Sequence, residues 1–166
     1  MTTPFKPETI AFDWWKRLNP DGGSSSSPHR DSLARMRRAD TPIEVFFEPE
    51  AIRLAARFNR HTTNFDRVAI IAGVLAHVRE TDERSVARAI GRTKFEDDQS
   101  AAVSESRFRR LLQAQNHELL DVMRRLVRML KGHVNVLDLS NSIFYWGDRV
   151  RQRWIFDYYG VDKQTD

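Results

Sequence analysis

The sequence predicts an all-α protein with about eight or nine helices in two packed helical-bundle lobes. Apolar residues recur at steps of three and four along most of the 166-residue chain. No stretch shows sustained apolar/polar alternation with a period of two, and nothing resembles a βαβ unit. We therefore expect one domain over residues 1–166, with an N-terminal lobe at about 5–92, a variable acidic loop at 93–103 and a C-terminal lobe at about 104–160.

The N-terminal lobe is expected to hold four longer helices and one short one. The longer helices are predicted at about 7–18, 28–39, 49–58 and 65–78, and the short one at 85–91. Pro7 and Pro49 suit the first position of a helix. The 65–78 segment is apolar on nearly all its faces, which predicts the buried centre of this lobe. Residues 43–47 fit either a short strand or a brief turn.

The C-terminal lobe is expected to contain a helix that opens at Ser104, a second at 118–131 and a single long helix at 138–159 with Asp138 as its N-cap. Gly147 is a point at which this last helix can bend. Its predicted buried face recurs at steps of four, three, four and four: Leu139, Ile143, Trp146, Val150 and Trp154. A second apolar set lies off that face and is expected to pack deeply or to be covered by a partner: Phe144, Ile155, Phe156 and Tyr159.

The charge balance favours polyanionic partners. The formal net charge is +4, the sequence pI is about 9.8, and 22 Arg stand against 5 Lys. Arg suits bidentate contacts with phosphates. A GC-rich genome is an equally good explanation of the Arg bias.

Several classes of protein are excluded or disfavoured by composition. There is no cysteine, which excludes disulfides, thiolate catalysis and Cys-ligated zinc. The N-terminus has no charged region followed by an apolar run, as a signal peptide requires. The longest apolar run, 68–76, is shorter than the roughly 20 residues of a membrane span. We expect a soluble, cytoplasmic protein without membrane contact.

No catalytic constellation is visible. The five histidines are scattered and form no metal-binding pair, and the sequence has neither a nucleophile elbow nor a P-loop. Asp97 and Asp98 are a weak candidate for a metal-dependent nuclease, since an acidic run in a loop is usually only solvated. We therefore expect no enzymatic activity, no metal and no cofactor.

Several motifs resemble the CasB family, the small subunit of the type I-E CRISPR surveillance complex, Cascade. The C-terminal motifs are Asp138-Leu139, Trp146-Gly147-Asp148, Arg151, Arg153-Trp154 and Tyr158-Tyr159. The others are Trp14-Trp15, the segments 33–39, 89–92 and 120–130, and Ser104-Glu105 followed by the Arg-Phe-Arg-Arg-Leu-Leu of 107–112. Together they extend from about Ala11 to Tyr159, and their order and spacing are more specific than any one of them.

This resemblance implies a non-catalytic helical subunit that is present in two copies in its complex. It implies contacts with the backbone subunits and the large subunit, which the protein would bridge. It also implies support of guide RNA and target DNA, and retention of the displaced strand.

Ten basic residues are the candidates for nucleic-acid contacts: Arg37, Arg38, Arg67, Arg107, Arg110, Arg124, Arg128, Lys131, Arg149 and Arg153. Phosphate contacts of this kind give affinity without base specificity. If the C-terminal helices pack side by side, their basic residues make one surface, in which Arg124, Arg128 and Lys131 form a ridge. The open alternative is that half of these residues pair with neighbouring carboxylates, among them Glu105, Glu118, Asp121 and Asp148.

A second class of function remains open, a helical DNA-binding regulator or another basic adaptor protein. The candidate reading residues are Gln113, Gln115 and Asn116, although no helix-turn-helix spacing surrounds them. Tyr145 is a candidate for stacking on a base, against the more common alternative that an aromatic at helical spacing belongs to the core.

Overall fold

The structure is a computed structural model that describes residues 4–20 and 28–161. These residues form ten α-helices and two 3-10 helices, without a β-strand among them, and the predicted all-α class is confirmed. The low-complexity loop expected at 24–27 lies outside the described residues. The helices are α1 (Pro7–Leu18), α2 (Arg30–Arg38), α3 (Pro42–Val45), α4 (Pro49–Phe58), α5 (Phe65–Leu75), α6 (Val86–Ile90), η1 (Asp98–Ser100), α7 (Glu105–Leu112), η2 (Asn116–Glu118), α8 (Leu119–Met129), α9 (Val136–Phe144) and α10 (Asp148–Tyr158).

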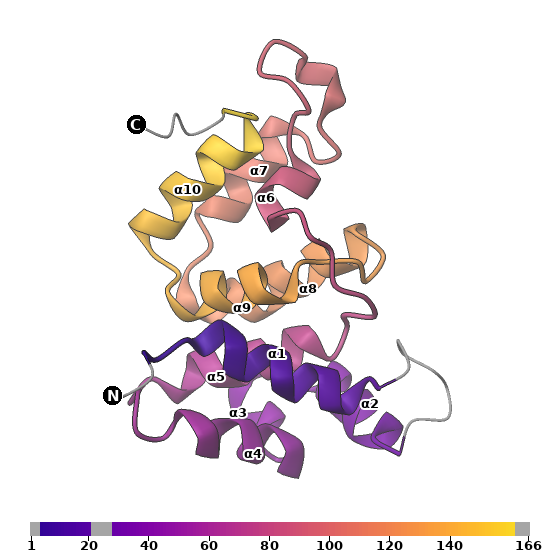
Figure 1. Ribbon diagram of the computed structural model, residues 1–166, viewed down its shortest axis with the longest axis vertical. Coiled ribbons are helices and arrows are strands. Elements are labelled where there is room, and N and C mark those ends of the chain that lie inside the picture. Colours follow the sequence, from indigo (N-terminus) through magenta and orange to yellow (C-terminus); the bar gives the residue numbers. More distant parts are fainter. Residues whose placement is uncertain (1–3, 21–27, 162–166) are drawn as a thin grey trace.

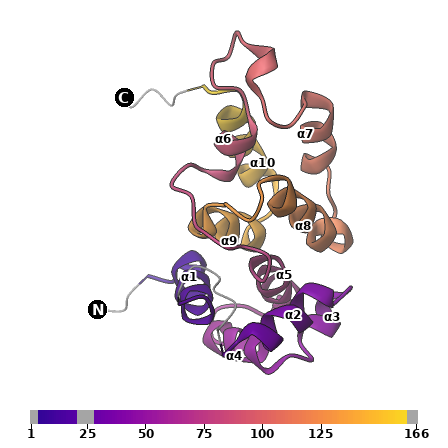
Figure 2. The ribbon, with the colours of Figure 1, turned by 90° about the vertical axis from the view of Figure 1, so that its right-hand side faces the viewer.

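The helices are stacked along the long axis of the molecule. Helices α1 to α5 occupy one end, α6, α7 and α10 occupy the other, and α8 and α9 lie between them (Figures 1 and 2). Helix α5 packs against α3, α4, α8 and α9, and every residue from 67 to 75 is buried. The prediction of a buried central helix is thus confirmed.

One apolar core runs through both ends of the molecule. Helix α1 packs against α9, and α6 packs against the last helix, α10. The sequence predicted α6 as part of the N-terminal lobe, whereas its main packing partner, α10, belongs to the predicted C-terminal lobe. The division of the chain into two lobes stays a prediction.

Polar caps begin several of the helices. The hydroxyls of Ser85 and Ser104 accept hydrogen bonds from main-chain N–H groups of α6 and α7, as expected. Thr41 caps α3 in the same way, so residues 43–47 begin within a short helix and form no strand. In the acidic loop, Asp97 caps η1, and the Ser100 hydroxyl accepts the N–H of Thr93.

The C-terminal segment is two helices, and the prediction of one helix over 138–159 is wrong. Helix α9 starts earlier, with Asn135 rather than Asp138 as its cap, and it ends at Phe144. Gly147 is fully extended (φ 176°, ψ −169°), which separates α9 from α10. The five residues of the predicted apolar face are nevertheless all buried, because the interruption restores the register.

All four tryptophans are buried, and each indole N–H has an acceptor. Trp14 donates to the carbonyl of Glu50, and Trp15 donates to that of Val78. Trp154 donates to the Ser142 hydroxyl at 3.0 Å, and Trp146 to the Ala114 carbonyl at 3.2 Å. These bonds connect distant parts of the chain and satisfy polar atoms that burial would otherwise leave unpaired.

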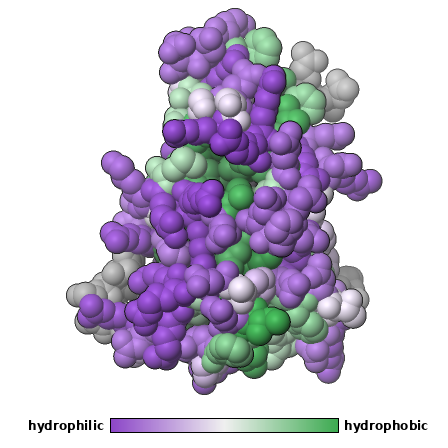
Figure 3. Space-filling view, turned by 180° about the vertical axis from the view of Figure 1, so that it is seen from behind, coloured by the Kyte–Doolittle hydropathy of each residue, from purple (hydrophilic) through white to green (hydrophobic). Residues whose placement is uncertain are grey.

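The outer surface is mainly hydrophilic on the face shown in Figure 3, with small hydrophobic areas. Exposed apolar side chains include Ile43, Phe47 and Ile52 on and beside α3 and α4, and Ile155 and Phe156 on α10. No helix in the described ranges has the length and apolar character needed to cross a membrane.

Candidate nucleic-acid interface

Six of the ten predicted residues present exposed cationic groups with neither a side-chain hydrogen bond nor a carboxylate partner in the described chain: Arg38, Arg107, Arg110, Arg128, Lys131 and Arg149. They lie at the end of α2, on α7, at the end of α8 and at the start of α10. Such groups are available to phosphates without first breaking an ion pair.

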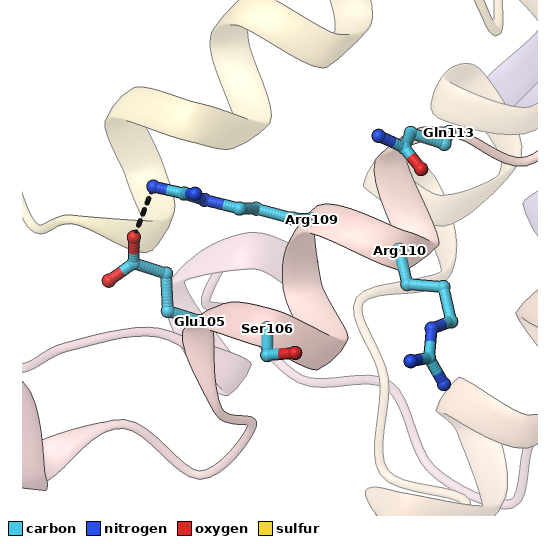
Figure 4. A pocket seen from close by; sticks show the side chains of 5 residues that line it. All are labelled: Glu105, Ser106, Arg109, Arg110 and Gln113. Carbon is cyan, nitrogen blue, oxygen red and sulfur yellow. Dashed lines mark hydrogen bonds and ion pairs between the residues drawn. The ribbon is translucent and has the colours of Figure 1, made fainter.

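The arginine side chains of α7 point in different directions. Arg109 forms an ion pair of 2.6 Å with Glu105, one helical turn earlier. Figure 4 shows Arg110 pointing away from that pair, on another side of the helix. Glu105, Ser106, Arg109, Arg110 and Gln113 line a shallow, open depression along this helix. Arg110 is therefore free to meet an external anion, whereas Arg109 is already neutralised.

Arg124 is not part of a solvent-facing ridge, and that prediction is wrong. Its side chain is buried, and its guanidinium donates to the carbonyls of Met36, Ala39 and Gly73. A Cβ on Gly73 would lie 3.1 Å from Arg124 Nη2, so this glycine provides the room for the guanidinium. Burial is the main cause that lowers the Arg124 pKa.

Arg67 is also buried, at 9% exposed, and it serves the interior. It donates to the carbonyl of Ile143 at 2.9 Å and to the side-chain oxygen of Asn116. Ile143 lies in the last turn of α9, where carbonyls have no partner within the helix. Arg67 therefore stabilises the end of α9 and is unavailable to a phosphate.

Two further candidates are partly engaged. Arg153 donates to Asp138 at 2.6 Å and to the Ser142 hydroxyl at 2.9 Å. Arg37 donates through Nε to the carbonyl of Ala76 at 2.6 Å, and no hydrogen bond is formed by its terminal nitrogens within the described chain. The alternative of carboxylate pairing thus holds for Arg153 and not for Arg37.

The C-terminal helices do not form one layer. Helix α8 packs on α5, whereas α10 packs on α6, and α9 intervenes between α8 and α10 in the chain. The carboxylates expected to neutralise the candidates mostly have other partners, since Glu105 pairs with Arg92 and Arg109, and Asp148 with Arg151.

The structure adds two residues that the sequence did not single out, Arg79 and His77. Both follow α5, and both adjoin Gly132 at the end of α8: Arg79 N–H donates to the Gly132 carbonyl at 2.8 Å. Arg37 reaches the same place through the carbonyl of Ala76. No local sequence signal marks Arg79, because only the packing of α2, α5 and α8 brings these residues together.

A family model described as CRISPR-associated protein Cse2 matches residues 32–159, from α2 to the end of α10. The chain belongs to the CRISPR-associated Cse2 family. A Cse2 protein of Thermus thermophilus is 26% identical over 155 residues, which cover 90% of this chain and 88% of that protein. The resemblance to the CasB family is thereby confirmed.

Two solved structures share the fold of this Cse2 family member. The crystal structure of CasB from Thermus thermophilus matches with a TM-score of 0.64 and 22% identity, covering 94% of this chain and 99% of that one. A chain of E. coli Cascade bound to a PAM-containing double-stranded DNA target matches with a TM-score of 0.66 and 19% identity, covering 96% and 97%.

Two of the three residues considered for a DNA-reading helix make local contacts in this Cse2 family member. Asn116 accepts a hydrogen bond from Arg67, and the main-chain N–H of Gln115 donates to Glu118. Both belong to a short 3-10 turn before α8. Tyr145, by contrast, is 49% exposed at the α9–α10 break, so it is not a core residue.

No group of three His, Asp or Glu side chains suited to a metal ion occurs in the part of the chain that the structure describes. The carboxylate of Asp97 accepts a hydrogen bond from Gln99 N–H as the cap of η1. That contact gives Asp97 a structural role in its own loop.

Proposed function

We propose that this chain is the non-catalytic small subunit of a type I-E CRISPR Cascade complex in antiviral defence. In the cytoplasm it bridges the backbone and large subunits, together with a second copy of itself. It binds guide RNA, target DNA and the displaced strand through phosphate contacts. The observation that carries this proposal is membership of the Cse2 family over residues 32–159.

The distribution of charge supports the nucleic-acid part of the proposal. Exposed cations without a carboxylate partner in the described chain occur on α7, α8 and α10, namely Arg107, Arg110, Arg128 and Arg149. Phosphate contacts are the same for every sequence, and a subunit that follows guide and target must accept any sequence. The proposal therefore assigns affinity, and not base recognition, to this protein.

The exposed apolar side chains support the bridging part. Phe47 is 77% exposed and Ile43 is 67% exposed at one end of the molecule, and Phe156 is 51% exposed on α10. Side chains of this kind are stabilised when a protein partner covers them. We assign these two areas to contacts with other subunits.

Assembly tests the proposal directly. The chain is expressed with the other subunits of a type I-E complex and a guide RNA, and a tag on the large subunit is used for purification. We expect the chain to copurify in a stable ratio, and complexes made without it to bind target DNA more weakly. Assembly and target affinity that are the same with and without the chain would overturn the proposal.

A further inference from the structure

Helices α2, α5 and α8 meet at a place where several basic residues gather with few acidic neighbours. Figure 2 shows α5 between α8 above and α2 below, and both helices pack on it. Arg37 comes from α2, His77 and Arg79 from the segment after α5, and Arg124 and Arg128 from α8. We call these five residues the α2–α8 cluster.

The main chain holds the cluster together. Arg37 Nε donates to the carbonyl of Ala76, next to His77. Arg79 N–H donates to the carbonyl of Gly132, four residues after Arg128. A Cβ on Gly132 would lie 3.1 Å from Arg79 Cγ and 3.3 Å from the His77 carbonyl, so the end of α8 touches this segment directly. The packing therefore brings these residues together from three separate segments of the chain.

The charges repel one another, and few acidic groups offset them. Burial, and then the charge of Arg79, lower the pKa of Arg37. Burial and then Arg124, Arg128 and Arg37 lower the pKa of His77 to about 4. The carboxylates of Asp121 and Asp40 partly offset the charge of Arg124, and Glu80 pairs with His133. In the described chain Arg37, Arg79 and Arg128 have no ion pair.

Two buried groups beneath the exposed arginines add to the excess of positive charge and unpaired polar atoms. The Arg124 guanidinium hydrogen-bonds only to carbonyls, so its full charge lies under the exposed arginines without a bonded counterion. His77 Nε2 is buried and has no hydrogen-bond partner. An unpaired buried charge or polar atom is unfavourable, and a bound anion offsets the charge.

We propose that Arg37, Arg79 and Arg128 form one phosphate-binding site, which takes a phosphodiester of a nucleic-acid backbone. This inference rests on the proposed function and assigns to it a specific site, in which Arg79 is a residue that sequence patterns do not reveal. The terminal nitrogens of the three arginines contact the phosphate oxygens. Arg124 acts from below as a positioning residue that fixes the end of α2, and its charge adds to the attraction.

The test is a binding titration with the full chain and a labelled single-stranded DNA of mixed sequence. Arg79→Gln and Arg128→Gln are compared with Arg125→Gln, an exposed arginine on the same helix as Arg128 that lies outside the cluster. The salt slope is the slope of the logarithm of the binding constant against the logarithm of the salt concentration. Removal of one phosphate-binding cation reduces its magnitude by about 0.7, which corresponds to a roughly fivefold weaker affinity at about 0.1 M salt. We expect this weakening for Arg79→Gln and Arg128→Gln, with Arg125→Gln close to wild type.

An NMR signal from His77 provides a second readout, at the site itself. The imidazole resonance of His77 is followed by NMR during the same titration, and we expect it to shift with the DNA in wild type and to shift less in Arg79→Gln. Inorganic phosphate at matched ionic strength distinguishes the sources of the ligand. If inorganic phosphate displaces the labelled DNA no more than chloride does, the site needs a polymer backbone. Strong displacement of the DNA by inorganic phosphate would identify a site for free phosphate and overturn the proposal.

Three other results would overturn this site. They are equally weakened binding in all three variants, a His77 resonance unmoved at saturating DNA, and no binding of DNA by wild type. None of them affects copurification with the complex, so failure of the site and failure of the proposed function are distinguishable.

Discussion

Arg67 and Arg124 each place a guanidinium in the protein interior and direct its hydrogen bonds to main-chain carbonyls. Arg67 donates to Ile143 at the end of α9, and Arg124 donates to Met36 and Ala39 at the end of α2. The last carbonyls of a helix have no partner within it, and a buried end without partners is unstable. Arg is suited to this role because its planar head carries five donors.

Replacement of Arg124 is therefore a stability experiment. We expect Arg124→Met to lower the free energy of unfolding by about 3 kcal/mol, because the carbonyls of Ala39 and Gly73 lose their donor and that of Met36 keeps only a 3.4 Å bond from Ala39 N–H. Arg125→Met, on an exposed position of the same helix, changes it by about 0.5 kcal/mol or less. Urea denaturation of both variants measures the difference, and equal stabilities would contradict the structural role of Arg124.

His77 makes the stability of the folded protein depend on pH. Its pKa in the folded protein is about 4, against the ordinary 6.5, because burial and three nearby arginines disfavour the imidazolium. Between these two values the unfolded chain binds a proton that the folded chain does not. The stability from this residue is thus complete above pH 6.5 and declines as the pH falls towards 4.

We expect the wild-type protein to lose about 1 kcal/mol more than His77→Gln between pH 7 and pH 5, after allowance for the partial exposure of the ring. Denaturation of both proteins at the two pH values measures this difference. Carboxylates with lowered pKa, such as Glu48, contribute equally to both proteins and cancel. Parallel pH profiles would show that His77 does not titrate as proposed.

At the scale of elements, the contact between α6 and α10 depends on one close approach. Arg92 N–H, just after α6, donates to the Tyr158 carbonyl at 2.6 Å. A Cβ on Gly91 would lie 2.2 Å from that oxygen and 2.5 Å from Tyr158 Cα. The two backbones therefore meet only because residue 91 has no side chain.

Gly91→Ala is expected to lower the free energy of unfolding by about 3 kcal/mol, since the backbone of α10 must shift. Gly147→Ala is the matched control. Gly147 has extended dihedral angles, and the nearest atom to an added Cβ is 3.5 Å away, so a change of about 0.5 kcal/mol or less is expected. Thermal denaturation compares the two, and a stable Gly91→Ala protein would show that α6 and α10 separate easily.

At the scale of the whole molecule, the surface carries both unpaired cations and exposed apolar side chains, and the two adjoin where Arg38 and Phe47 line one open depression. The unpaired cations among the predicted residues lie at the end of α2, on α7, at the end of α8 and at the start of α10. The most exposed apolar side chains lie on and beside α3 and α4, at Phe95 in the acidic loop and on α10. This arrangement suits a subunit that contacts proteins and nucleic acid at the same time.

We expect Arg107→Glu with Arg110→Glu to weaken target-DNA binding by the assembled complex, similarly for unrelated sequences. The salt slope should fall by about 0.7 for each phosphate of a single strand that the variant no longer neutralises. Both residues are exposed, so the fold is expected to survive. A salt titration of affinity, with incorporation of the subunit checked, is the measurement.

The control for this experiment is Arg57→Glu with Arg60→Glu, which makes the same change of charge at the same spacing near the end of α4. The control is expected to bind with nearly the wild-type affinity and slope. Equal effects of the two double variants would mean that net charge, and not the position of α7, determines binding.

The sequence by itself determined the fold class, most helices and the family. Apolar spacing at three and four residues reports which face of a helix meets the core, and this pattern is local. It correctly placed α1, α4 and α5, the caps Ser85 and Ser104, and the buried face shared by α9 and α10. The motifs of 104–159 likewise identified the family from their order along the chain.

Only the tertiary structure decided which cations face solvent. Arg124 and Arg128 are one turn apart on α8, yet one is buried and the other exposed. The difference arises because main-chain carbonyls at the ends of α2 and α5 accept hydrogen bonds from Arg124, and these partners are 51 to 88 residues away in the sequence. Helical spacing predicts the direction in which a side chain points. Whether solvent or another segment lies in that direction depends on the packing of residues that are distant in the sequence.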